Sequence, residues 1–120
     1  AVETGLFNVV SHIDIVRIWG FTPSDGFLDE QNVLRLVKQH GMCIEVSSRG
    51  LRQPVNSIYP SQRIMRKTRE LEISLTVGTD AHSVEEIDYA YDSLINYVEA
   101  FGYDSIATIS KRRIMERKFE

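Results

Sequence analysis

The stretch ISLTVGTDAHSVEEIDYAYDSLINYVEAFG, residues 73–102, contains an apolar run, a polar turn and a long amphipathic pattern in succession. Residues 73–80 are rich in β-branched side chains, which favours a buried strand. Residues 83–102 predict a helix, with Ser83 and Glu86 at the spacing of a capping box. Its apolar face is expected to contain Ile87, Tyr91, Leu94, Ile95 and Val98. The stretch therefore predicts a strand followed by a helix, the repeating unit of α/β folds.

The same alternation extends in both directions along the chain. The expected strands are 6–12, 42–47, 73–80 and 105–110, and the expected helices are 28–40, 61–72 and 83–102. Polar loops are expected at 21–26 and 48–60, and Ser61 is a plausible N-cap of the helix that follows. Strands that alternate with helices in this way predict a parallel sheet, because parallel neighbours need long crossover connections.

Composition and charge indicate a soluble globular protein. The 120 residues are 42% hydrophobic and 26% charged, with a net charge of −3 that gives no overall attraction to nucleic acid. The basic segment 110–120 is interrupted by two glutamates and is interpreted as a solvated terminal face. The lone Cys43 excludes an internal disulfide, and its apolar neighbours favour a small buried residue over a nucleophile. No apolar run reaches the roughly 20 residues that span a bilayer, so we expect a cytoplasmic protein without a membrane partner.

Polar side chains follow three of the expected strands, at 11–14, 45–52 and 79–83. The carboxyl ends of parallel strands meet at one edge of a sheet, and ligands of parallel α/β folds bind there. We therefore expect the histidine, aspartate and arginine side chains of these three segments to converge on one rim.

Asp80 and His82 are the first candidates for chemistry on this rim. On an extended strand end, side chains two residues apart leave the backbone on the same side, and a carboxylate with an imidazole suits Zn, Mn or Fe. His12 ends its own strand and is a third candidate ligand. Asp14 either orients a metal-bound imidazole or is an ordinary loop carboxylate. The alternative is that Asp80 or Ser83 only caps the following helix, with His82 on the surface.

Arginines are the second group enriched near the rim. Arg17 follows the first strand end, and Arg49 and Arg52 lie in the loop after the second. Guanidinium groups match phosphate oxygens in two-point geometry, so arginines around a metal centre suggest a phosphate ester. Glu45, within an apolar strand, is expected to hold the loop or a ligand histidine and not to bind metal itself. His40 is interpreted as a helix-end residue that faces solvent.

Three segments together resemble one known family. They are GLFNVVSHIDIVRIWG (5–20), CIEVSSRGLRQPVNSIYPS (43–61) and LTVGTDAHSVEEIDYAYD (75–92). In this order and spacing they are similar to the C-terminal half of the polymerase-and-histidinol-phosphatase (PHP) family. The SHID segment and the SRGLRQP…YPS loop resemble the histidinol-phosphatase branch most closely.

The resemblance implies the C-terminal part of a distorted (β/α)7 TIM-like barrel with a multinuclear centre of divalent transition metals. It assigns His12, Asp80 and His82 as metal ligands and as the catalytic residues acting through those metals. Arg17, Arg52 and Arg49 are then the expected contacts of a small-molecule phosphate monoester, L-histidinol phosphate in this branch. The H-x-H motif that opens the family is missing, so residues 1–120 are expected to be the C-terminal portion of a PHP-type domain.

Two further functions stay open from the sequence. One keeps the PHP family but changes the substrate to a nucleotide or a nucleic-acid end; without a basic, aromatic-lined groove, the sequence argues against a nucleic-acid partner. The other is a catalytically silent assembly module that pairs through an open sheet edge, as a homo-oligomer for example.

Overall fold

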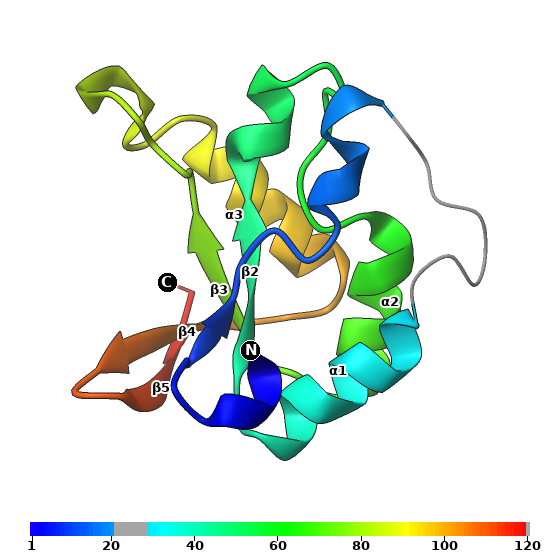
Figure 1. Ribbon diagram of the computed structural model, residues 1–120. Helices are drawn as coiled ribbons and strands as arrows, with labels where there is room; N and C mark the ends of the chain where they lie inside the picture. The colour runs from blue at the N-terminus through cyan, green and yellow to red at the C-terminus, as the bar shows by residue number, and fades with distance from the viewer. Residues whose placement is uncertain (21–28, 120) are drawn as a thin grey trace.

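The computed structural model describes residues 1–20 and 29–119. These form a three-stranded sheet, helices packed against one of its faces, and a separate β-hairpin (Figure 1). The loop expected at 21–26 lies outside the described residues. None of the helices in the described parts of the chain is long and apolar enough to cross a membrane.

The central sheet is parallel, as the alternation of strands and helices predicts. Its order is β1 (Val9–Val10), β2 (Cys43–Ser47) and β3 (Leu75–Gly78), with each strand shorter than the apolar run that predicted it. Residue 47 lies opposite residue 78, so β2 and β3 end level with each other, whereas β1 ends opposite residue 44, three residues before the end of β2. The described residues contain no closed barrel, so the TIM-like barrel is not confirmed.

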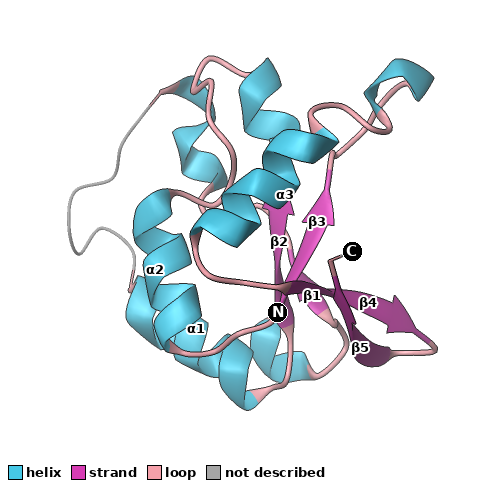
Figure 2. Ribbon diagram, turned by 180° about the vertical axis from the view of Figure 1, so that it is seen from behind, coloured by secondary structure: helices cyan, strands magenta, loops and turns pink. Residues whose placement is uncertain are grey.

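Three helices cover one face of this sheet (Figure 2). They are α1 (Glu30–Gln39), α2 (Gln62–Glu70) and α3 (Tyr91–Ala100). The buried apolar side chains between helices and sheet are Leu34, Val37, Met42, Ile44, Val46, Ile64, Met65, Ile73, Leu75, Leu94 and Val98. Burial of these side chains is the main stabilising contribution to the fold. A buried carboxylate on Glu30 also joins α1 to α2 by accepting from Lys67 Nζ at 3.1 Å.

The prediction of a fourth parallel strand is wrong in its pairing. Strand β4 (Ser105–Ser110) forms where expected, but it pairs antiparallel with β5 (Arg113–Lys118) in a hairpin of its own. The two residues between the strands, Lys111 and Arg112, have φ of 48° and 63°, which is the two-residue turn that matches strand twist. This turn usually contains Asn or Gly, so the sequence offers little signal for it. The terminal segment is therefore a strand, with mostly exposed side chains as expected.

The helix expected at 83–102 is divided in two. A short 3-10 helix, η4 (Val84–Glu86), comes first, and α3 begins only at Tyr91, after Ala90 adopts a left-handed φ of 55°. The predicted capping box does not form, because Ser83 makes no side-chain cap bond. The predicted apolar face is correct from Leu94 onward, whereas Ile87 and Tyr91 are exposed.

Helix α2 starts as predicted, but its N-cap works differently. Ser61 occupies the N-cap position and makes no side-chain bond to the helix. Its backbone N–H instead donates to Asp14 Oδ2 at 2.8 Å, so a carboxylate from the segment after β1 fixes the start of α2. A negative charge at a helix N-terminus is favourable.

Candidate functional site

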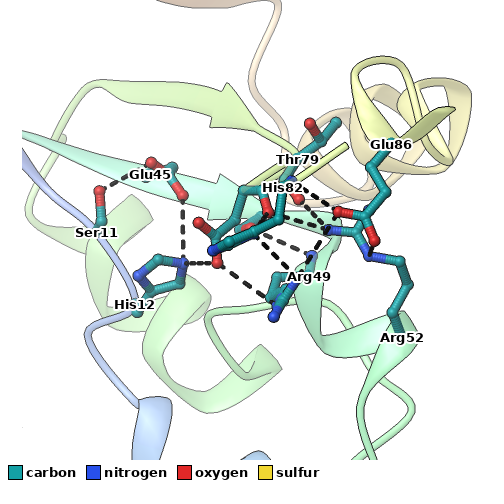
Figure 3. A network of polar contacts seen from close by, with 10 residues as sticks. Ser11, His12, Glu45, Arg49, Arg52, Thr79, His82 and Glu86 are labelled. Atoms are coloured by element: carbon teal, nitrogen blue, oxygen red, sulfur yellow. Dashed lines mark hydrogen bonds and ion pairs between the residues drawn. The ribbon is translucent and has the colours of Figure 1, made fainter. Parts of the chain in front are cut away.

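The carboxyl ends of the three parallel strands bring together most of the residues that the sequence singled out. His12 lies two residues after β1, Arg49 lies in the 3-10 helix η3 (Ser48–Arg52) after β2, and His82 follows β3. Their side chains point toward one another over the ends of the strands (Figure 3). The predicted convergence on one rim is therefore present for these segments.

His12 and Asp80 form the closest pair on this rim. Nε2 of His12 lies 3.3 Å from Oδ2 of Asp80, although the two residues are 68 positions apart in the chain. Both have left-handed backbones, with φ of 49° and 50°. Such a conformation costs on the order of 1 kcal/mol for a residue other than glycine and is enriched at functional sites. The reasoning that Asp80 ends an extended strand is wrong, since its positive φ turns the chain sharply instead.

Glu45 reaches the same place from the middle of β2. Its Oε2 accepts a hydrogen bond from Ser11 Oγ at 2.8 Å, and its Oε1 lies 3.9 Å from His12 Nε2. Gly78 on β3 leaves room for this carboxyl group, because a Cβ there would lie 3.1 Å from the carboxyl carbon. Glu45 thus faces a candidate ligand histidine, as predicted. Its carboxylate also lies near enough to His12 to be a metal ligand itself.

His82 is held by its own turn. Its Nδ1 lies 2.7 Å from the carbonyl oxygen of Asp80 and 3.3 Å from Nη1 of Arg49. A single nitrogen cannot donate to a carbonyl and accept from a guanidinium at once, and the shorter contact identifies Nδ1 as the donor. The lone pair is then on Nε2. A backbone carbonyl on one ring nitrogen is the arrangement that prepares the other nitrogen to bind a metal.

Arg49 and Arg52 flank this turn from η3. Arg49 Nε lies 3.6 Å from Asp80 Oδ2, and Arg52 Nη2 donates to the carbonyl oxygen of Thr79 at 2.6 Å. Gly50, between them, has no room for a side chain, because a Cβ would lie 1.9 Å from a carbonyl oxygen of residue 57. The tight backbone contact fixes η3, and with it the two arginines, beside the end of β3.

Arg17 stands apart from the other two predicted arginines. It donates from Nη1 to Asp14 Oδ2 at 3.0 Å and from Nη2 to Ser57 Oγ at 2.7 Å. Asp14 therefore positions Arg17 and helix α2, and the structure records no contact from it to an imidazole among the described residues. The link to the rim is Tyr59: the Arg17 guanidinium lies 5.7 Å from its ring centre, and the His12 ring meets it edge-on at 6.4 Å.

Buried polar atoms without a hydrogen-bond partner gather at this rim. In the described parts of the chain they are His12 Nε2, Asp14 Oδ1, Glu45 Oε1, Arg52 Nε, Arg52 Nη1 and Tyr59 Oη. Native proteins satisfy nearly all such atoms, so a cluster of exceptions calls for an explanation. All six belong to the segments after β1 and β2 or to β2 itself. The simplest explanation of the cluster is a bound ligand that supplies the missing partners.

The donor set fits a metal ion in part. Among the described residues, no three His, Cys, Asp or Glu side chains are gathered tightly enough to form a complete site. The 3.3 Å between His12 Nε2 and Asp80 Oδ2 is nevertheless close to the separation of about 3.4 Å for two donors on one tetrahedral ion. An unpartnered imidazole nitrogen and a carboxylate oxygen are also the donors that Zn, Mn and Fe accept. His12 and Asp80 therefore suit a shared ion, with His82 beside them.

Three residues of the site were missed or underrated from the sequence. Tyr59 has a fully buried side chain between Arg17 and His12, and burial raises the pKa of its phenol. Glu86 was expected only in a capping box, and Ser11 only as a member of the polar segment 11–14. The Tyr-Pro pair that contains Tyr59 gave no signal beyond that of a turn.

Cys43 is buried as predicted, and burial raises its thiol pKa to about 11. His40 is exposed, also as predicted.

Comparisons with known proteins point to phosphatases. A probable histidinol-phosphatase of Deinococcus radiodurans is 26% identical over 102 residues, which are 85% of this chain and 39% of that protein. A probable phosphatase of Vibrio parahaemolyticus is 32% identical over 117 residues, 92% of this chain and 46% of that protein. No family model matches the chain. The chain thus spans less than half the length of the curated relatives it matches.

Proposed function

We propose that this chain supplies part of the active site of a metal-dependent phosphatase of the PHP type. The observation that carries the proposal is the His12–Asp80 pair, with 3.3 Å between Nε2 and Oδ2, surrounded by arginines and by buried atoms without partners. The two relatives named as probable phosphatases support the same class of reaction. L-histidinol phosphate is the proposed substrate, following the name of one relative and the resemblance of the SHID and SRGLRQP segments.

The proposed metal ligands from this chain are His12, Asp80 and His82. When bound, divalent ions supply a nucleophilic hydroxide at neutral pH and neutralise charge on a phosphoryl group. The Nδ1–H donated to the carbonyl oxygen of Asp80 leaves Nε2 of His82 as its ligand atom. Oε1 of Glu45 faces the same nitrogen of His12, Nε2, at 3.9 Å.

The arginines are proposed to bind the phosphoryl oxygens. Arg49 and Arg52 lie closest to Asp80, and in the described part of the chain Arg52 has two buried nitrogens without a hydrogen-bond partner, whereas Arg17 is held by Asp14 and Ser57. Fixed guanidinium groups stabilise the charge that develops on the oxygens in phosphoryl transfer without reorganisation, which is usually a large contribution to catalysis.

A substrate panel tests this proposal in the full-length protein. The panel compares L-histidinol phosphate with nucleoside monophosphates and 3′-phosphorylated DNA ends, before and after removal of metal with a chelator. We expect histidinol phosphate to give the highest kcat/KM, and chelation followed by Mn or Zn addition to abolish and then restore turnover. Preference for nucleotides or DNA ends would replace the substrate assignment. A metal-loaded protein that hydrolyses none of them would contradict the proposed reaction and favour the silent assembly module.

A further inference from the structure

Glu86 lies between the two arginines of the rim, although its place in the sequence suggested only a helix cap. Its carboxylate Oε1 lies 3.5 Å from Arg52 Nε, and its Oε2 lies 3.8 Å from Arg49 Nη1. Oε2 also accepts the backbone N–H of His82 at 2.8 Å. Figure 3 shows this carboxylate facing Arg52 at the edge of the cluster. Two guanidinium groups and one backbone amide thus surround a single anion that belongs to the protein.

These three groups are donors of the type that a phosphate group uses. Guanidinium forks and backbone N–H groups are the common partners of phosphate oxygens. The Glu86 carboxylate already lies among these donors, so an incoming anion meets a position that contains a negative charge.

The hold of Glu86 on the arginines is incomplete. Its contacts with Arg52 and Arg49 are ion pairs at 3.5 and 3.8 Å, respectively, longer than the 2.7–2.9 Å or so of charge-assisted hydrogen bonds. Nε and Nη1 of Arg52 are buried and have no hydrogen-bond partner in the part of the chain that the structure describes. A phosphate group has more oxygens and more charge than a carboxylate, so it satisfies these nitrogens better.

We propose that Glu86 is a positioning residue that holds Arg49 and Arg52 in place before ligand binding and is displaced by the phosphate group of the ligand. The inference rests on the proposed phosphate site and adds a competitor within it. Each binding event then includes the cost of separating Glu86 from two arginines, and each release of phosphate regains it. Glu86 thereby weakens the affinity for phosphate and favours the departure of the product.

The test is calorimetric titration of inorganic phosphate into the full-length protein with Glu86→Gln, with Glu85→Gln as a matched control. Glu85 is the neighbouring residue, is exposed, and changes the net charge by the same amount. Glutamine keeps an oxygen that accepts the His82 N–H but removes the charge. Because two partly exposed ion pairs are lost, we expect Glu86→Gln to tighten phosphate binding by roughly three- to tenfold, and Glu85→Gln to change it by less than about twofold.

A second pair of variants keeps the result interpretable. In an Arg49→Gln background, the tightening caused by Glu86→Gln should shrink, because one of the two ion pairs no longer exists. In the assay, Glu86→Gln should lower KM for a phosphate monoester and strengthen product inhibition by phosphate. Unchanged or weaker phosphate binding in Glu86→Gln, with Glu85→Gln like the wild type, would overturn the inference.

The outcomes separate this inference from the proposed function. Tighter phosphate binding in Glu86→Gln, in a protein that hydrolyses no monoester, supports the role of Glu86 as a competitor of phosphate and contradicts the proposed phosphatase activity. Hydrolysis of monoesters by the wild type, without tighter phosphate binding in Glu86→Gln, supports the proposed phosphatase activity and contradicts the role of Glu86 as a competitor. A wild-type protein to which phosphate does not bind at all contradicts both.

Discussion

The helix-covered face of the sheet and the rim after its strands have opposite chemical character. On the helix-covered face, Ile44, Val46 and Leu75 are fully buried among other apolar side chains. A few residues farther along, the chain turns through left-handed conformations at His12 and Asp80 and leaves buried nitrogen and oxygen atoms without partners. Stability is thus concentrated in one region, and strain and unsatisfied polar groups in the other. The rim therefore lowers the stability of a fold that the core stabilises, which is typical of functional sites.

The largest effect on stability is expected from the core. Leu34 on α1 is fully buried, and Leu34→Ala should lower the free energy of unfolding by about 2–5 kcal/mol because a cavity remains. Val33→Ala, one residue away and 37% exposed, should cost less than about 1 kcal/mol. Chemical denaturation measures both. Leu34→Ala should leave kcat/KM unchanged under conditions where the variant is folded, and an altered kcat/KM would contradict the separation of core and rim.

An intermediate effect, on ligand binding, is expected at Arg52. This guanidinium donates to the carbonyl oxygen of Thr79 and lies 4.9 Å from the ring centre of Tyr89, and lysine cannot reproduce both contacts. Arg52→Lys should raise KM for a phosphate monoester by roughly tenfold, as expected for a lost two-point contact. Arg35→Lys, at an exposed position of α1, is the matched control. Equal kinetics for the two variants would remove Arg52 from the binding site.

The smallest effect is expected at the hydroxyl groups of two tyrosines, Tyr59, which is buried, and Tyr97, which is partly buried. The Tyr97 hydroxyl donates to the carbonyl oxygen of Pro60 at 2.9 Å, whereas the Tyr59 hydroxyl has no partner in the described part of the chain. Tyr97→Phe should therefore lower the free energy of unfolding by about 1 kcal/mol, whereas Tyr59→Phe should lose nothing or gain stability. Denaturation curves of both variants measure these free energies of unfolding. An equal loss in both would show that the rim hydroxyl is satisfied after all.

The sequence predicts the parallel sheet and the meeting of His12 with Asp80 for one physical reason. Apolar runs and helical spacing are determined by the core, and parallel strands bring their carboxyl ends together wherever the connections are helices. Whether these side chains bind metal, and whether Arg17 joins Arg49 and Arg52 at a ligand, stay predictions. Asp14 holds Arg17 instead, through an i, i+3 contact that the spacing allows but does not require.

The features that the sequence did not predict depend on local turns and distant contacts. The hairpin of β4 and β5 rests on left-handed Lys111 and Arg112, residues that rarely signal such a turn. The break before α3 rests on Ala90, a good helix former whose left-handed φ is imposed by its surroundings. Glu86 has the spacing of a capping residue, but the fold places two arginines beside it and so gives it another partner.

The most direct test of the rim as a catalytic site is the turnover of Asp80→Asn in the full-length protein. Asparagine tolerates the left-handed backbone and preserves the shape of the side chain, so the fold should be retained. Because the proposed metal ligand and its charge are lost, kcat/KM for L-histidinol phosphate should fall at least roughly a thousandfold. Asp92→Asn, an exposed position on α3 with the same change in charge, should leave it unaltered. Near-normal turnover in folded Asp80→Asn would contradict the assignment of this rim as the active site.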